Sequence, residues 1–220
     1  MILYRYGGMI KLSAAGIPQS MIGEYLGLFA STEIFIFVFM EIVTKIDAFQ
    51  RVIFKNARLN DYIVFTLLLG LFSIFGTYIG TAGSYGAISN IRDLAPMVAG
   101  LVAGPYVGLA VGLIGGIHRL LLGGLTSVPC SIATVLAGLF AGLVYRLKKE
   151  ELLGIVPAML FAFAIEVIHG GLALLLVHPY SVALEVVFTS IPKMIIANSL
   201  GIAICVIIIH GTHASSRSVA

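Results

Sequence analysis

The stretch GLVAGPYVGLAVGLIGGIHR, residues 100–119, decides how the rest of the chain is interpreted. It is apolar up to its last two residues, His118 and Arg119, and Pro105 interrupts it. Glycine recurs at every fourth position, so a helix here would carry a smooth stripe that lets another helix approach closely. We therefore predict close helix packing with a break at the proline. The stripe consists of Gly100, Gly104, Gly108, Gly112 and Gly116.

The composition places the chain in a membrane. Of its 220 residues, 60% are hydrophobic and 10% are charged, which is too little polar surface to cover a water-soluble globule. Several apolar runs reach about 18 residues, the length that a helix needs to cross the hydrocarbon layer. No run alternates polar and apolar residues in the manner of a membrane β-barrel. The sequence predicts an all-α, polytopic helical membrane bundle.

Short loops join the apolar segments, as expected for one compact bundle of five to six hydrophobic helical segments. We expect a transmembrane domain over residues 26–210. An N-terminal extension of unknown role (1–25) would precede it, and a short cytoplasmic tail (211–220) would follow. The segments lie near residues 26–45, 62–80, 94–118, 127–145, 154–177 and 182–209.

Basic residues predict the orientation of the bundle. Short loops rich in Lys and Arg stay in the cytoplasm, so loops 45–61 and 146–149 and the C-terminus should all lie inside. An odd number of crossings must then separate residue 93 from residue 146, although two apolar segments lie between them. One of these segments should therefore enter and leave on the same side. The basic residues are Lys45, Arg51, Lys55, Arg58, Arg146, Lys148, Lys149 and Arg217.

Segment 94–118 is the better candidate for a re-entrant hairpin, because Gly104 and Pro105 fall near its middle. Two half-helices of about 11 residues would each reach about 16 Å, half of the hydrocarbon thickness. The alternative is an ordinary, kinked spanning helix. A continuous helix would hold Arg92 and Arg119 about 40 Å apart, whereas a hairpin would bring both to the outer face.

The two arginines are the leading candidates for ligand binding, since charge is costly within a membrane. Arg92 lies in SNIRDLAP, where Asn90 is a candidate helix cap and Asp93 a candidate ion-pair partner; a solvated loop arginine is the alternative. Arg119 has no carboxylate nearby in the sequence. It needs an anionic ligand, a distant partner such as Glu166, or a path to water. The guanidinium fork suits a carboxylate.

The remaining polar candidates have both structural and functional interpretations. Glu166 and His169 stand three residues apart on one helical face and would form a hydrogen bond or a proton relay. Lys193 would reach the interface or neutralise Glu166. His118 is a candidate ligand contact, although a structural hydrogen bond fits it better. We expect no metal ion, because no ligand cluster with zinc spacing is present.

Cys130 and Ser131 open the fourth segment, where a helix N-terminus would direct unpaired amides toward the outer cavity. The alternative is an ordinary helix start, and the two cysteines, Cys130 and Cys205, would then be packed thiols. No nucleophile and base pair, phosphate loop or kinase motif is evident. We therefore expect neither catalysis nor a cofactor. We also expect no nucleic-acid partner, because no run of basic residues is dense enough to suggest one.

Three stretches carry a family resemblance: NIRDLAPMVAGLVAGPYVGLAVGLIGGIHRLLLGGLTSVPC (90–130), EVIHGGLALLLVHPYSVAL (166–184) and IPKMIIANSLGIAI (191–204). They resemble the LytS-type five-transmembrane receptor region of two-component sensor histidine kinases. The resemblance covers residues 26–210. It implies a receptor domain associated with cell-wall regulation or pyruvate sensing, normally followed by a cytoplasmic kinase.

The resemblance also implies ligand residues. In the pyruvate-sensing branch these are two arginines, a cysteine and a serine three residues later, and the first three fall on Arg92, Arg119 and Cys130. The fourth falls on Ala133, which puts pyruvate itself in doubt, and Ser131 would face about 200° away on a helix. Because the chain ends without a kinase, a separate or missing output domain is expected.

We therefore expect a membrane-embedded sensing module that binds a small anionic ligand, such as a carboxylate, in an outward-facing cavity. Its partners would be the lipid bilayer and a separate signalling protein or a second copy of the chain. The alternative function is substrate capture for a small-molecule or vitamin transporter. An exposed surface for an energising partner would favour the transporter.

Overall fold

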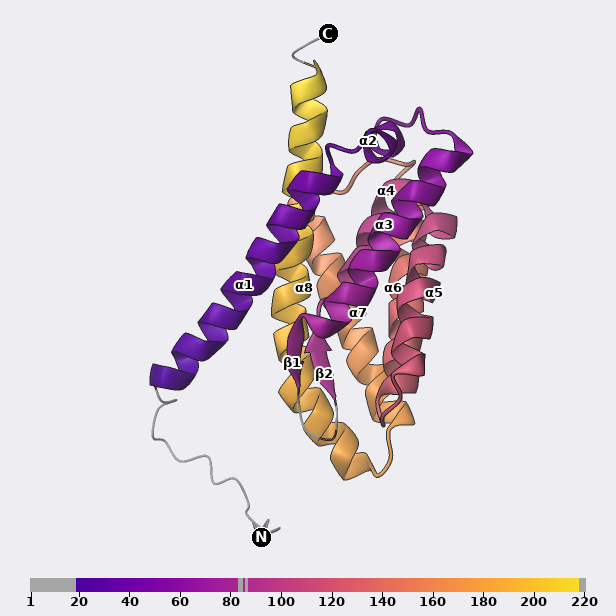
Figure 1. The fold of residues 1–220 in the computed structure, drawn as a ribbon. Coiled ribbons are helices and arrows are strands. Elements are labelled where there is room, and N and C mark those ends of the chain that lie inside the picture. Colours follow the sequence, from indigo (N-terminus) through magenta and orange to yellow (C-terminus); the bar gives the residue numbers. More distant parts are fainter. Residues whose placement is uncertain (1–18, 83–84, 86, 218–220) are drawn as a thin grey trace.

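The computed structural model describes residues 19–82, 85 and 87–217, and within that part the chain forms a bundle of helices with one short β-hairpin (Figure 1). Four of these helices are long and apolar enough to cross a membrane by length and composition, namely α3, α6, α7 and residues 180–212 of α8. The predicted all-α membrane bundle is confirmed. The elements are α1 (Gln19–Val43), α2 (Asp47–Ile53), α3 (Leu59–Tyr78), β1 (Gly80–Ala82), β2 (Ile88–Asn90), α4 (Leu94–Ala103), α5 (Pro105–Leu121), α6 (Ser127–Leu147), α7 (Ile155–Leu176) and α8 (Tyr180–Arg217).

The helix boundaries lie close to the predicted segments, except at the two ends of the chain. Helix α1 begins at Gln19, inside the predicted extension 1–25, and the rest of that prediction lies outside the described residues. Helix α8 continues to Arg217, so residues 211–217 are helical where a tail was predicted. The predicted boundary was too early because it followed the apolar residues of α8, whereas the helix itself continues into the polar residues 211–217.

The Gly-rich third segment folds back on itself. Helix α4 ends at Gly104, whose φ of +86° suits glycine, and α5 begins with Pro105 at its first position. The two helices are unequal, with 10 and 17 residues, and Gly104 packs against Tyr145 near the end of α6. The predicted pair of equal half-helices with a turn at mid-depth is therefore wrong in its proportions. Helix α5 is about 25 Å long, which is longer than half of the hydrocarbon thickness.

The inequality arises because α4 begins inside the bundle. Strand β2 pairs antiparallel with β1, and the chain that follows is tied to α3 by two hydrogen bonds. The amide of Ile91 donates to the carbonyl of Gly76 (3.3 Å), and the Ser73 hydroxyl donates to the carbonyl of Arg92 (3.0 Å). Arg92 and the start of α4 therefore lie beside the last turns of α3, inside the bundle.

The glycine stripe packs on α6 at backbone distance. A Cβ on Gly100 would lie 2.5 Å from the carbonyl oxygen of Gly138, and a Cβ on Gly108 would meet the same oxygen. Further along α5, Gly112 and Gly116 approach the carbonyl oxygens of Thr134 and Ser131. Side chains at these positions would push the helices apart, so the stripe allows α4 and α5 to lie directly on α6.

Both basic loops and the end of α8 meet at one end of the bundle (Figure 1). Lys55 Nζ lies 3.8 Å from Glu150 Oε2, which joins the loop after α2 to the loop after α6. The ring of His210, on α8, is 3.0 Å from the carbonyl oxygen of Leu153. The β-hairpin and the α7–α8 turn lie toward the opposite end (Figure 1). This arrangement satisfies the crossing parity that the loop charges required.

Candidate ligand site

A cluster of buried polar side chains surrounds Asp93, the residue at the start of α4. The Thr134 hydroxyl donates to Asp93 Oδ1 (2.6 Å), and His169 Nδ1 lies 3.0 Å from Asp93 Oδ2. Arg92 Nε lies 3.5 Å from Oδ1. All four side chains are at most 2% exposed. The predicted ion pair between Arg92 and Asp93 is therefore present, and α6 and α7 share the same carboxylate.

Two asparagines hold the backbone that carries Arg92. Asn90 Oδ1 accepts a hydrogen bond from the Arg92 amide (3.0 Å), and its Nδ2 donates to the carbonyl of Ile88 (2.7 Å). Asn198, on α8, donates to the Asn90 carbonyl (3.2 Å) and to Glu166 Oε1 (2.8 Å). Asn90 thus shapes the turn before α4 and links it to α7 and α8.

Arg92 is fully buried and only partly paired. Its Nε donates to the Thr134 hydroxyl (2.8 Å). Its two terminal nitrogens, Nη1 and Nη2, are buried and have no hydrogen-bond partner among the described residues. A solvated loop arginine, the alternative interpretation of the sequence, is excluded because the side chain is 0% exposed.

Arg119 lies at the end of α5 and holds the loop to α6. Its Nη1 donates to the carbonyl of Gly123 (2.6 Å) and its Nη2 to the hydroxyl of Thr126 (2.9 Å), while Nε is buried without a hydrogen-bond partner in the described part of the chain. No carboxylate of the described residues forms a salt bridge with it. A buried cation without an ionic partner is unusual and costly.

Cys130 lies on α6 between the threonines that the two arginines bind. Arg119 Nη2 donates to the hydroxyl of Thr126, four residues before Cys130, and Arg92 Nε donates to the hydroxyl of Thr134, four residues after it. The Cys130 Sγ also lies 3.2 Å from His169 Nε2. The folded-back third segment therefore brings both guanidinium groups near one thiol.

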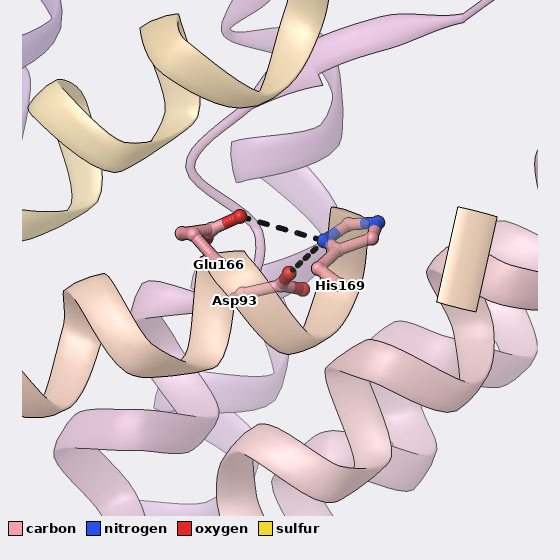
Figure 2. A group of neighbouring side chains, drawn as sticks. All are labelled: Asp93, Glu166 and His169. Carbon is pink, nitrogen blue, oxygen red and sulfur yellow. Dashed lines mark hydrogen bonds and ion pairs between the residues drawn. The ribbon is translucent and has the colours of Figure 1, made fainter. Parts of the chain in front are cut away.

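His169 connects the cysteine with two carboxylates. Its Nδ1 faces Asp93 Oδ2 at 3.0 Å and Glu166 Oε2 at 3.5 Å, as Figure 2 shows. The ligand atoms of these three residues lie within 4.8 Å of one another, a spacing that would suit a metal ion. However, Arg92 already supplies positive charge to Asp93 and would repel a metal cation. The arrangement favours an internal hydrogen-bond network.

The other predicted site residues lie around this cluster. His118 Nε2 lies 3.1 Å from the Tyr78 hydroxyl, and Ser131 Oγ donates to the carbonyl of Ser127 in its own helix (2.6 Å). Lys193 lines a small cavity of about 30 Å³ with Thr32 and other residues of α1, the β-hairpin and α8. The structure does not bring these three side chains to the Cys130 thiol.

Sequence reasoning missed two contributors to this cluster, Thr134 and Asn198, and one acid with buried oxygens elsewhere, Glu33. Thr134 bridges Arg92 and Asp93, and its spacing of four residues from Cys130 was the available signal. Asn198 is a buried amide within an apolar segment. Glu33, on α1, has two buried carboxylate oxygens with no hydrogen-bond partner in the described region, and one lies beside Gly201 of α8.

Comparison with known proteins gives one family and several relatives. The family model described as 5TMR of 5TMR-LYT matches residues 46–212. The sensor histidine kinase BtsS of Escherichia coli is 29% identical over 168 residues, which are 74% of this chain and 30% of that protein. The sensor protein LytS of Bacillus anthracis is 29% identical over 175 residues, 73% of this chain and 30% of that protein.

One further relative matches over a shorter stretch, with a higher sequence identity. The sensor histidine kinase YpdA of Escherichia coli is 37% identical over 101 residues, 44% of this chain and 18% of that protein. The chain thus spans about 30% of the length of the relatives BtsS and LytS and matches only one region of them. No solved structure gives a significant match.

Proposed function

This chain belongs to the 5TMR-LYT family of membrane receptor regions, and from that premise we propose that it senses a small anion at the cluster of Arg92, Arg119 and Cys130. A carboxylate fits this cluster best. Its planar pair of oxygens matches the parallel N–H donors of a guanidinium. The family and the named sensor kinases support a sensing role in a multi-pass membrane protein.

The observation that carries the proposal is the set of unsatisfied guanidinium donors. Arg92 Nη1 and Nη2 and Arg119 Nε are buried without partners among the described residues, and Arg119 lacks a carboxylate. Each unpaired buried donor costs about 1–3 kcal/mol, and more where it is charged. An anion between the two side chains would satisfy these donors and balance the charge.

The ligand is not assigned as pyruvate. The resemblance places a serine of the pyruvate-sensing branch at Ala133, which has no hydroxyl. The neighbouring Thr134 hydroxyl is already engaged with Arg92 and Asp93. A carboxylate would therefore meet the two arginines and the thiol, with other groups of the ligand still to be identified.

Signal transmission would run along the third segment. Arg92 precedes α4 and Arg119 ends α5, so an anion that draws the two together acts on both arms of the hairpin. The turn between the arms packs against Tyr145 near the basic loops. We place this basic end, with the C-terminus, in the cytoplasm. Transmission requires that the anion bind two packings of the hairpin unequally.

Thermal-shift measurements on the purified chain test the proposal. Acetate, lactate, pyruvate and succinate would be compared with neutral acetamide, on the wild type, Arg119→Gln and Arg92→Gln. We expect at least one carboxylate to raise the unfolding temperature of the wild type alone. Arg146→Gln is the matched control, because Arg146 is an exposed arginine that stacks on Tyr106 at the other end of α5. Equal shifts in all variants, or none in the wild type, would refute the proposal.

Reconstituted vesicles separate sensing from transport. A receptor would bind the stabilising carboxylate without moving it across the bilayer. Accumulation of radiolabelled carboxylate inside the vesicles, lost in Arg119→Gln, would favour the transport component instead.

A further inference from the structure

Cys130, His169 and Asp93 form a linear chain of contacts that anion binding alone does not require. The Cys130 sulfur lies 3.2 Å from His169 Nε2, and the opposite ring nitrogen lies 3.0 Å from Asp93 Oδ2. The three residues come from α6, α7 and the start of α4, so their convergence is a property of the folded bundle. A nucleophile, a base and a group that orients the base are the parts of an activated thiol.

The surroundings fix the roles in this chain. Asp93 accepts hydrogen bonds, so His169 carries its proton on Nδ1 and presents the lone pair of Nε2 to the sulfur. Asp93 is itself held by the Thr134 hydroxyl at 2.6 Å. Arg92 brings a positive charge to the same cluster, because its Nε donates to the Thr134 hydroxyl at 2.8 Å, and a neighbouring cation lowers the cost of a thiolate. Asp93 is a positioning residue for the imidazole.

Resting on the proposed anion site, we infer that Cys130 is an activated nucleophile that captures small anions carrying an electrophilic carbon, through a covalent bond to its sulfur. The thiol proton passes to His169 Nε2 as the sulfur attacks. When the electrophilic carbon is a carbonyl, the S–C bond forms, the π electrons of the C=O bond move to oxygen, and this oxygen takes the proton back from Nε2. That capture is reversible. With iodoacetate, the S–C bond forms, the C–I bond breaks and iodide leaves with the electron pair.

The thiol lies toward the end of the bundle that the proposed function places outside. Cys130 is the fourth residue of α6 and follows the short loop that Arg119 holds. Its side chain is 8% exposed. The unpaired Nη1 and Nη2 of Arg92 supply donors for a carboxylate. Cys205, in α8, lies outside this cluster, and its removal leaves a single thiol.

The experiment compares iodoacetate with iodoacetamide, which has the same reactive carbon without the negative charge. The full chain carries Cys205→Ala, so that Cys130 is its single thiol. Its labelling rate at pH 6.5 is measured by intact-mass spectrometry, once for the native protein and once for the protein unfolded in a denaturing detergent. An ordinary thiol is only about 1% thiolate at this pH. We expect native Cys130 to react with iodoacetate at least about tenfold faster than the unfolded chain, and to prefer iodoacetate over iodoacetamide. Slower labelling in the native state would overturn the inference.

Variants separate the thiol from the anion site. His169→Gln should lower the native iodoacetate rate to that of the unfolded chain, while His210→Gln, a histidine at the opposite end, should leave it unchanged. A native rate that does not depend on His169 overturns the activated thiol and leaves the anion site intact. If a non-reactive carboxylate stabilises the protein but Cys130 is not labelled, only the covalent step fails. If the His169→Gln variant does not fold, the inference is judged on the Cys205→Ala chain alone, by the ratio of its iodoacetate labelling rates in the native and unfolded states.

Discussion

Asp93 and His169 stand 76 residues apart in the sequence, yet the carboxylate Oδ2 and the imidazole Nδ1 meet at 3.0 Å in the interior of the bundle. Figure 2 shows this pair beside Glu166. The contact joins the start of α4 to the middle of α7, and Arg92 lies on the other carboxylate oxygen. The buried carboxylate of Asp93 thus contacts Arg92, His169 and Thr134, and it holds these three side chains of the candidate site together.

Replacement of Asp93 by Ala should therefore destabilise the protein strongly. The substitution leaves Arg92 without its carboxylate in a buried position, and breaking a buried pair costs about 3–5 kcal/mol. The measurement is the free energy of unfolding in detergent with increasing denaturant. Asp47→Ala is the control, because Asp47 is 84% exposed and solvent screens its pair with Arg51, so that its loss should have little effect on stability. Equal effects of the two substitutions would contradict the central role of Asp93.

Substitution of Thr134 by Val tests the hydroxyl that was missed from the sequence. Valine keeps the shape but removes the acceptor for Arg92 Nε and the donor to Asp93. We expect the free energy of unfolding to fall by about 1–3 kcal/mol. The stabilising carboxylate should also raise the unfolding temperature of this variant less than that of the wild type. Thr189→Val serves as the matched control, since that exposed hydroxyl donates only to backbone carbonyls of its own helix. A Thr134→Val protein as stable as the control would remove Thr134 from the cluster.

The close approach of α5 and α6 predicts a steric effect at Gly138. A Cβ at this position would meet the backbone of Gly108, which has no flexible end to move aside. Gly138→Ala should lower the unfolding free energy by about 1–3 kcal/mol, or more if the helices separate. At Gly171 in α7, where nothing lies within 4 Å of an added Cβ, alanine should be neutral or stabilising. Thermal unfolding of both variants checks the contrast.

The path of the chain predicts which loops share a side. In a background with Cys130→Ala and Cys205→Ala, single cysteines are placed at Tyr85, Leu125 and Glu150. A membrane-impermeant maleimide added to intact cells should label the first two positions, in the β-hairpin and the α5–α6 loop. The third position, in the basic loop after α6, should react only after lysis. Labelling of only one of positions 85 and 125 would contradict the fold-back of the third segment.

The sequence predicted the features that depend on local chemistry. Long apolar runs indicated the spans, and Pro105 indicated the break because proline cannot donate the hydrogen bond of a continuing helix. The pair of Glu166 and His169 followed from helical spacing. The depth of the turn at Gly104 did not follow, because it depends on how far the chain before α4 folds into the bundle. That depth is set by contacts of residues 91 and 92 with α3.

The centre of the site depended on contacts between distant segments, which one sequence does not reveal. Apart from the family resemblance, the sequence around Cys130 indicated only a helix start, since its partner His169 is 39 residues away. Thr134 looked like an ordinary small residue in an apolar helix. Arg119 was recognised because a charge without a nearby partner is unusual in a membrane segment, and this imbalance is visible without coordinates.

The most direct test of the account is a double-mutant cycle on the two arginines, with the affinity for the stabilising carboxylate measured by calorimetry. Lysine keeps the charge but loses the guanidinium fork, so Arg92→Lys and Arg119→Lys should each weaken binding. If one anion lies between the two side chains, the double variant should bind more tightly than the product of the two single losses predicts, with a coupling of about 0.5–3 kcal/mol. Losses that multiply independently, or a carboxylate affinity that neither substitution changes, would contradict a shared site.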